Sequence, residues 1–219
     1  LRSGNMGRIA MGSSGTLGRH LLPDIFSSFK KENPLVEMVL HIGTVHRICK
    51  MTVDGQIDFG FVIGKNDLPG LSDKTVAKEE LVIVARANHS LSSKELVTPE
   101  ELSDYPFVTA LKESSHYQML DKILRANKIA VRNIVVELED AESIKQVVRS
   151  GLGVAVLLKA CVIEELKQGT LKIIKSTRGP MHIDLQLISR PDKSVSPIQI
   201  KFLNFFYKRL NDILPPVVV

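Results

Sequence analysis

The sequence predicts an α/β protein of two lobes, and three observations predict that fold. Hydrophobic residues make up 44% of the 219 residues, which is enough for a sizeable core. Short apolar segments alternate with amphipathic segments along most of the chain, as in proteins with mainly parallel sheets. Two long extended segments, Thr75–Ala87 and His182–Arg190, bracket the middle of the chain. We expect them to be two crossover strands that join the lobes.

The first lobe is expected to begin with the strand Arg8–Met11, which ends at the small polar residues of Gly12–Gly15. Large apolar residues then recur with helical spacing from Leu17 to Phe29, and Pro23 indicates a kink or a late start within that helix. A strand that is apolar on both faces is typical of the centre of a sheet. The remaining expected elements are the strand Leu35–Ile42, a helix that Thr44 caps and Asp54-Gly55 ends, and the apolar strand Ile57–Ile63.

The second lobe is expected to repeat this order, and a C-terminal helix returns to the first lobe. That helix begins with Ser196 as N-cap and Pro197 at its first position. We place the first lobe at residues 1–83 and 188–219 and the second at residues 84–187. The elements expected in the second lobe are the strand Tyr105–Thr109, a helix opened by Ser114 or Ser115, the strand Ile134–Leu138, a helix between Asp140 and Gly151, and the buried strand Val154–Leu158.

The formal charge of +5 invites a nucleic-acid interpretation, but the charge is localised. Residues 164–219 contain nine Lys/Arg and five Asp/Glu, whereas the rest of the chain contains 20 and 19. Lys and Arg never occur more than two in a row. The sequence therefore shows no basic stripe of the kind that follows a DNA backbone.

Two cysteines, Cys49 and Cys161, are too few for a disulfide framework or a cysteine zinc site, and we expect both to be buried thiols. No apolar run is longer than that of Val154–Leu158, which is far shorter than a membrane span. The segment Leu1–Gly7 lacks the form of a secretory signal peptide. These features favour a cytoplasmic protein without a membrane anchor, although a processed secreted protein would look the same.

Small polar residues occupy three expected strand-to-helix turns. They are Gly12–Thr16, Gly43–His46 and Glu113–His116. Free N–H groups and a partial positive charge at a helix N-terminus favour carboxylate, sulfate or phosphate. Plain N-capping explains any one turn equally well. Three such turns at carboxyl ends of strands, in both lobes, predict an anion-binding cleft between the lobes.

Other site chemistries have little support in the sequence. The glycines from Gly12 to Gly18 lack the lysine of a phosphate-binding loop. His46 and His116 have no further ligands at metal spacing, so we expect no metal, and each histidine could equally be a solvated or capping residue. No Gly-x-Ser-x-Gly nucleophile motif is present. We therefore expect neither catalysis nor a cofactor.

The order of several motifs resembles the effector-binding domain of LysR-type transcriptional regulators over about residues 7–210. The most specific pieces are Asp54-Gly55-x-Ile57-Asp58, Asn88-His89-Ser90-Leu91 and Val148-x-x-Gly151-x-Gly153-Val154. The resemblance implies two Rossmann-like lobes joined by two crossover strands, similar to periplasmic binding proteins of type II. It also implies a bacterial ligand sensor that acts in transcription regulation and is normally attached to an N-terminal winged helix-turn-helix, which this sequence does not contain.

The resemblance also implies which residues contact the effector. The positions that match the family's contacts are Ser13, Ser14, Thr16, Thr44, His46, Ser114, Ser115 and His116, with Ile63 or Gly64 lining the wall. Two departures weaken an assignment of the effector by subfamily: Leu158 stands where the family usually has proline, and Arg47 accompanies His46 in the second turn. Sensor domains of this family pair side by side, which here would place the helix Leu17–Phe29 against the partner's helix 141–149 in a homodimer or tetramer.

The implied partners are a small anionic effector and, through the missing domain only, DNA. Two alternatives share the same scaffold. A periplasmic solute-binding protein of a transporter would have a gene encoding a signal peptide, whereas a regulator would have about 90 codons of helix-turn-helix. An enzyme would convert the bound acid, whereas a sensor would return it unchanged.

Overall fold

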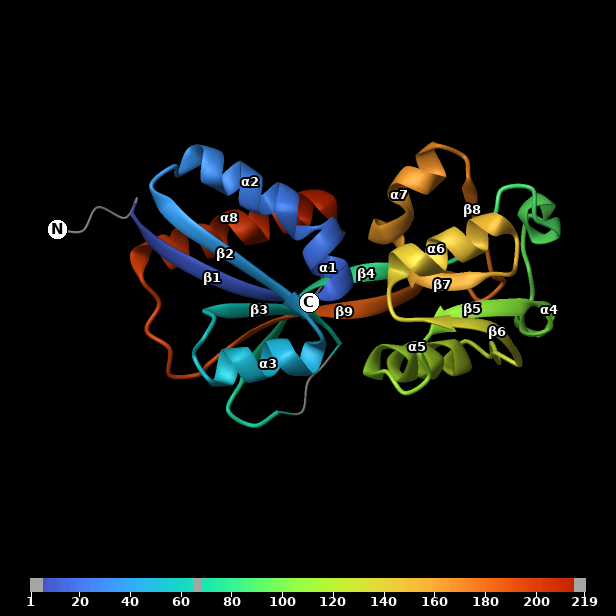
Figure 1. Ribbon diagram of the computed structural model, residues 1–219, viewed down its shortest axis with the longest axis horizontal. Helices are drawn as coiled ribbons and strands as arrows, with labels where there is room; N and C mark the ends of the chain where they lie inside the picture. Colours follow the sequence, from blue (N-terminus) through green and yellow to red (C-terminus); the bar gives the residue numbers. More distant parts are fainter. Residues whose placement is uncertain (1–5, 65–67, 215–219) are drawn as a thin grey trace. The chain divides into compact units, whose positions relative to one another are not determined.

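The computed structural model describes residues 6–64 and 68–214, and it divides the chain into two compact units (Figure 1). The first unit comprises Leu1–Glu79 and Ile183–Val219, and the second comprises Glu80–His182. The chain therefore enters the second unit once and leaves it once.

Two long strands have residues in both units. They are β4 (Ser72–Arg86) and β9 (Met181–Ser189), and each is the hydrogen-bonded neighbour of the other. Their positions match the two extended segments of the sequence, so the prediction of two crossover strands is confirmed.

The first unit is a sheet with helices on both faces. Strand β1 pairs in parallel with β2 on one side and with β3 on the other, and β3 pairs antiparallel with β9. Helix α3 lies on one face of this sheet, and α2 and α8 lie on the other (Figure 1). Its elements besides β4 and β9 are β1 (Gly7–Ser14), α1 (Gly15–His20), α2 (Leu22–Glu32), β2 (Val36–Gly43), α3 (Val45–Val53), β3 (Phe59–Ile63) and α8 (Pro197–Ile213).

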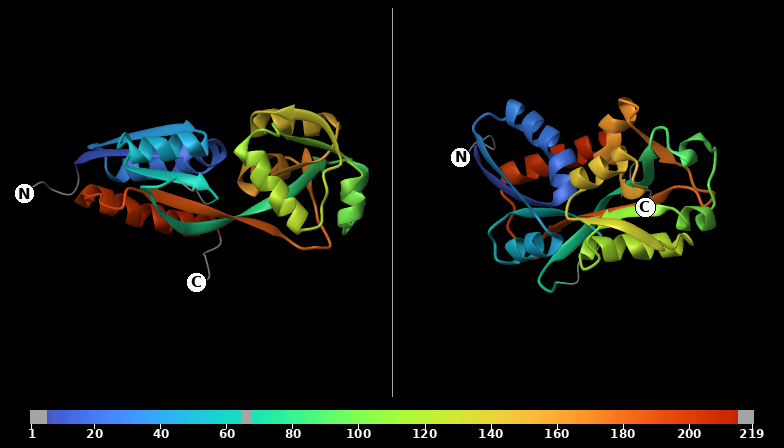
Figure 2. Two further views of the ribbon diagram at one scale, coloured as in Figure 1. Left: turned by 90° about the horizontal axis from the view of Figure 1, so that it is seen from below. Right: turned by 45° about the vertical axis from the view of Figure 1, so that its right-hand side comes forward.

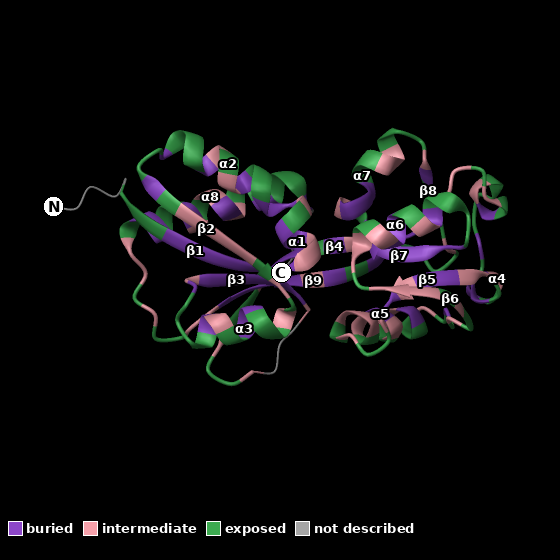
Figure 3. Ribbon diagram, viewed as in Figure 1, coloured by how far each residue is buried: buried purple, intermediate pink, exposed green. Residues whose placement is uncertain are grey.

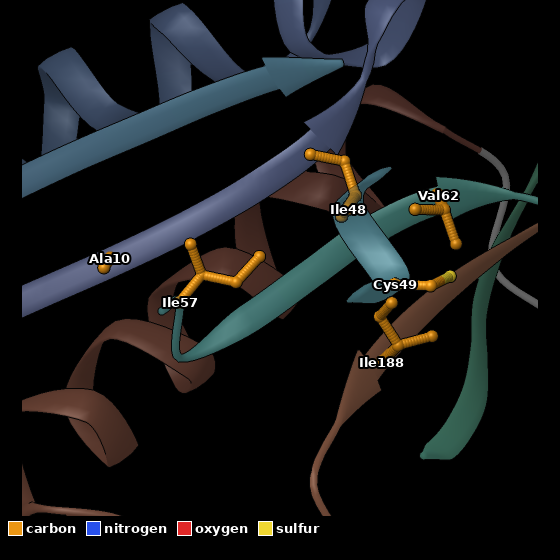
Figure 4. Packing of buried hydrophobic residues seen from close by; sticks show 6 residues of the cluster. All are labelled: Ala10, Ile48, Cys49, Ile57, Val62 and Ile188. Atoms are coloured by element: carbon orange, nitrogen blue, oxygen red, sulfur yellow. The ribbon is translucent and has the colours of Figure 1, made fainter. Parts of the chain in front are cut away.

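Each face of this sheet has its own apolar core. Ile48 and Cys49 of α3 pack against Ile57, Val62 and Ile188 on one face (Figure 4). The opposite face is aromatic, because rings of α2 and β3 meet rings of α8 edge to face. The ring pairs are Phe29 and Phe202 at 5.1 Å, Phe26 and Phe202 at 5.6 Å, and Phe61 and Phe206 at 5.2 Å. Every residue of β3 is buried between the two faces, as predicted (Figure 3).

The helix expected over Leu17–Phe29 is two helices in the structure. Helix α1 ends at His20, and α2 begins at Leu22 with Pro23 in its first turn. Proline has no N–H to donate to the preceding turn, so a new helix starts there at no cost in hydrogen bonds. Of the two expected alternatives, the structure therefore shows an interruption of the helix near Pro23 and not a late start, since α1 already begins at Gly15.

The second unit contains a parallel pair and an antiparallel group of strands. Strand β5 pairs in parallel with β6, whereas the later part of β4 pairs antiparallel with β7 and β8. Helix α5 packs on β5, and α6 packs on β5, β6 and β7. Figure 2 shows this unit from two further directions. Its elements are a 3-10 helix (Ser90–Ser93), α4 (Pro99–Ser103), β5 (Pro106–Ala110), α5 (Ser115–Ala126), β6 (Asn133–Leu138), α6 (Ala141–Ser150), β7 (Ala155–Leu158), α7 (Lys159–Lys167) and β8 (Leu171–Ile174).

The expectation of mainly parallel sheets is only partly right. Strands β7, β8 and β9 are all antiparallel to a neighbour. Helix α4, helix α7 and strand β8 were not predicted. They have five, nine and four residues, which is too short for a clear periodic pattern.

The predicted helix caps are confirmed. Thr44, Asp140 and Ser196 each accept a hydrogen bond from a backbone N–H in the first turn of their helix, and Ser196 forms a complete capping box with Gln199. Of the two candidates for α5, Ser114 is the cap. Gly151 ends α6 with φ of 93°, a left-handed conformation that glycine adopts without strain.

Candidate functional site

The first and second polar turns lie at one edge of the first unit's sheet. In the parallel register Ser14 is the neighbour of Gly43, and Ser13 is the neighbour of Phe61. Thr44 directly follows β2, and Ile63 is the last residue of β3. The carboxyl ends of three adjacent strands therefore bring together the residues that the sequence predicts for this unit.

Ser13 is fully buried, and its hydroxyl already has a protein partner. Its Oγ donates to the carbonyl of Phe61 at 2.9 Å, which ties β1 to β3. A hydroxyl carries a single proton. An anion would therefore have to compete with this bond for Ser13.

Ser14 differs from Ser13 in the hydrogen bonding of its hydroxyl. It stands in the N-cap position of α1 and is only 5% exposed, but its side chain makes no capping hydrogen bond. Its Oγ is buried and has no hydrogen-bond partner among the described residues. An unsatisfied buried hydroxyl costs about 1–3 kcal/mol. A ligand with an oxyanion would remove that cost. Thr16, in the first turn of α1, is partly exposed.

The second turn carries cationic and titratable side chains. Thr44 Oγ1 accepts a hydrogen bond of 3.2 Å from the N–H of Arg47, and both Thr44 and His46 are exposed. The side-chain stem of Arg47 lies against Gly43, since a Cβ at Gly43 would be 3.1 Å from Arg47 Cδ. Arg47 was not among the predicted contact residues, although the sequence showed it in this turn. It brings a positive charge to this edge of the sheet.

The third polar turn lies at the corresponding edge of the second unit, where β5 and β6 end side by side at Ala110 and Leu138. The hydroxyl of Ser114 accepts from the N–H of Tyr117 at 3.1 Å and donates to the carbonyl of Leu111 at 2.6 Å. Ser114 is thus used as a cap, whereas Ser115 is exposed. Burial lowers the pKa of His116, which favours the neutral imidazole.

The carboxylate of Glu137 also lies at this edge of the second unit, and it was not among the residues predicted from the sequence. Glu137 accepts a hydrogen bond from the backbone N–H of Lys112 at 3.0 Å and forms an ion pair of 3.3 Å with its ammonium group. The hydrogen bond from that N–H, with the nearby positive charge, lowers the pKa of Glu137. Glu137 is one residue from the end of β6. Only the pairing of β5 and β6 brings it beside Lys112.

The described residues contain no group of three or more His, Cys, Asp or Glu that could hold a metal ion. Within the same ranges, no helix is long and apolar enough to cross a membrane. Cys49 and Cys161 are buried thiols that form no disulfide, as predicted.

Residues 2–211 match the family described as the LysR substrate binding domain. A probable RuBisCO transcriptional regulator of Chlorokybus atmophyticus is 28% identical over 207 residues, covering 92% of this chain and 66% of the relative. A protein of the same description from Thalassiosira pseudonana is 28% identical over 219 residues, covering 96% of this chain and 69% of the relative. The chain thus spans about two thirds of the length of these relatives.

Solved structures match the fold closely at low sequence identity. The regulatory domain of Synechocystis PCC6803 CcmR in complex with 2-PG has a TM-score of 0.82 at 22% identity, with 93% of this chain and 97% of that chain covered. The effector binding domain of QuiR in complex with shikimate has a TM-score of 0.79 at 18% identity, with 95% and 99% covered. Both were solved with a small molecule bound.

Proposed function

This chain belongs to the LysR substrate-binding domain family, and on that premise we propose that it is the effector sensor of a longer transcription regulator. The effector is a small anion that carries a carboxylate or phosphate group. Its binding favours one conformation of the sensor, and this population shift alters how the full-length protein binds DNA.

The observation that carries the proposal is the unsatisfied, buried hydroxyl of Ser14. It stands at the carboxyl edge of the sheet, beside the exposed first turn of α3 and the positive charge of Arg47. We assign Ser13, Thr16, Thr44, His46 and Ile63 to the same site. We propose a similar role for Ser114, Ser115 and His116 at the corresponding edge of the second unit. The structures of CcmR with 2-PG and of QuiR with shikimate have a similar fold and support a small-molecule ligand for this chain.

The remaining parts of the proposal concern the whole protein. The sensor forms homodimers or tetramers, in which the segment Leu17–Phe29 faces the partner's α6, and the protein acts in the cytoplasm. It contacts DNA through a helix-turn-helix domain outside this chain. It needs no cofactor and releases its effector chemically unchanged, which distinguishes it from an enzyme.

A Ser14→Ala substitution tests the site. The effector loses a hydrogen bond to a charged group, which is worth about 1.5–3 kcal/mol, so its affinity falls roughly tenfold to a hundredfold. Without effector the variant is at least as stable as the parent, because the deleted hydroxyl is buried and has no partner among the described residues. Isothermal titration calorimetry measures the affinity, and 2-PG, shikimate and inorganic phosphate are the first probes.

The matched control is Ser27→Ala, an exposed serine of α2, which leaves affinity unchanged. A second variant, Thr44→Glu, places a negative charge at the same edge of the sheet and abolishes binding of an anion without altering the core. An unchanged affinity in both Ser14→Ala and Thr44→Glu would show that the site lies elsewhere.

A further inference from the structure

The first unit contains a pocket of about 610 Å³ that the proposed effector site does not use. It lies among the loop between β9 and α8, the turn at Gly70 and the side chain of Asp58. This volume is typical of pockets that bind small molecules.

The pocket is at the opposite end of the sheet from Ser14. Asp58 directly precedes β3, and Arg190 directly follows β9. Because β3 and β9 are antiparallel, with Gly60 opposite Ile188, these two residues lie at the same end of the pair. Strand β3 has five residues, so at about 3.3 Å per residue the pocket and the carboxyl edge lie roughly 13 Å apart.

One cation of the pocket is already neutralised. Lys193 forms an ion pair with Asp58, and its side chain is only 7% exposed. Its ammonium group also lies 4.5 Å from the centre of the Phe59 ring. Asp58 in turn accepts a hydrogen bond of 2.7 Å from the N–H of Ala10. This pair fixes the loop after β9 to the sheet.

The second cation, Arg190, is held in place without a partner for its charge. Its guanidinium occupies the space beside Gly55, since a Cβ at Gly55 would be 1.9 Å from its terminal nitrogen. Gly55 has φ of 73°, so the left-handed turn and this close approach both require glycine. Across the described ranges, no carboxylate or other acceptor contacts the guanidinium. Asp192, also in the pocket wall, is exposed to solvent and forms no ion pair there.

Two further features favour an anion beside Arg190. The N-terminus of α8, a helix of 17 residues, opens on this pocket through Ser196 and Gln199, and its dipole favours negative charge. Burial lowers the pKa of Lys193, the hydrogen bond to Asp58 opposes that effect, and the nearby charge of Arg190 adds to the lowering. The two cations thus repel each other, and a bound anion would relieve that repulsion.

We propose that this pocket is a second ligand site, in which the guanidinium of Arg190 binds a carboxylate or phosphate group of a small molecule. The planar guanidinium offers two parallel N–H donors to such a group. The hydroxyl of Ser194, in the same loop, is placed to add a further donor. A ligand here joins the loop that follows β9 to the turn that precedes β4, so it contacts the ends of both crossover strands.

Nuclear magnetic resonance titration of the whole chain tests the site, with inorganic phosphate and acetate as probes and chloride at equal ionic strength as the reference. Phosphate and acetate shift the backbone amides of residues 192–196 and 199, and chloride does not. In Arg190→Gln the dissociation constant for phosphate rises at least tenfold. Arg190→Lys, which keeps the charge but not the paired donors, shows a smaller loss.

Two controls separate this site from other causes. Arg178→Gln removes an exposed arginine of the second unit and leaves the titration unchanged. Ser14→Ala also leaves it unchanged, so failure of the effector site and failure of this one are distinguishable. The proposal is overturned if chloride shifts the same amides equally, or if folded Arg190→Gln or Arg190→Lys binds phosphate as the parent does.

Discussion

Neighbouring residues of one type have different chemistry in this protein because of their surroundings. Ser13 and Ser14 are adjacent and both buried, but the hydroxyl of Ser13 donates to the carbonyl of Phe61, whereas that of Ser14 has no partner among the described residues. The same holds for the pocket cations, since Lys193 pairs with Asp58 and Arg190 lies over Gly55. The fold therefore decides which of these polar groups already has a protein partner and which is available to a ligand.

The Cys49 thiol illustrates the same dependence on surroundings, and it gives a prediction at this scale. Burial among apolar side chains raises the pKa of Cys49 to about 11. Since the thiolate is the reactive form, we expect the folded protein to resist alkylation by iodoacetamide at pH 8. In denaturant, Cys49 and Cys161 both react. Mass spectrometry after a timed reaction checks this, and rapid modification of Cys49 in the folded protein would contradict it.

Helices of the second unit are joined by a buried ion cluster. Lys145 of α6, with a side chain only 6% exposed, forms ion pairs of 2.9 Å with Glu142 and Glu165, and it donates to the carbonyl of Cys161 in α7. Burial alone would lower the pKa of Lys145, but the hydrogen bonds to the two carboxylates outweigh it and raise that pKa. For Glu165, burial opposes the hydrogen bond from Lys145, and the net pKa is lowered.

Replacement of Lys145 therefore weakens the attachment of α7. In Lys145→Met the carboxylate of Glu165 stays largely buried without its cation, which lowers the free energy of unfolding by about 3 kcal/mol at pH 7. Lys167→Met, which removes an exposed partner of Glu164, changes it by less than about 0.5 kcal/mol. Urea denaturation measures both.

The pH dependence of this difference follows from the pKa of Glu165. Its folded pKa is depressed, so the ion pair stabilises the fold above the ordinary carboxyl pKa and is lost as pH falls through the lowered value. The deficit of Lys145→Met in the free energy of unfolding, relative to the parent, thus becomes smaller in acid. A deficit that is constant down to pH 3 would mean that lost packing, and not the ion pair, is responsible.

In the molecule as a whole, the two units differ in how many segments of the chain form them. The second unit is one continuous segment, whereas the first needs residues from both sides of it. Strand β9 supplies Ile188 to the core beneath α3, and α8 supplies Phe202 and Phe206 to the aromatic face. The first unit is therefore complete only when residues after 182 have docked.

A truncation after His182 tests this dependence. It removes Phe202 and Phe206, and loss of each large buried ring costs about 3–5 kcal/mol, which together approaches the total stability of a typical domain. We expect the amides of β1 and β3 to lose protection from hydrogen exchange while those of β5 and β6 keep it. Mass spectrometry of the exchanged protein reports both units at once, and the full chain is the control. Equal protection of β1 in both chains would contradict the expected dependence.

Local patterns in the sequence account for the alternation of strands and helices, the helix caps, the interruption near Pro23 and the family resemblance. These features depend on residues within a few positions of one another, so local chemistry specifies them. The short elements α4, α7 and β8 escaped prediction, as did the antiparallel strands, because four to nine residues give a weak pattern and strand direction depends on the partner.

Which of the polar residues are available to a ligand depends on contacts between distant segments, and the sequence could not predict it. Ser114 stands in a predicted turn, but its hydroxyl already donates to the carbonyl of Leu111, whereas the hydroxyl of Ser14 has no partner among the described residues. The pocket at Arg190 was also invisible in the sequence, since its walls come from segments more than 130 residues apart, as the pairing of Asp58 with Lys193 shows. Such pairings arise from the packing of distant segments, so they cannot be predicted from local sequence patterns.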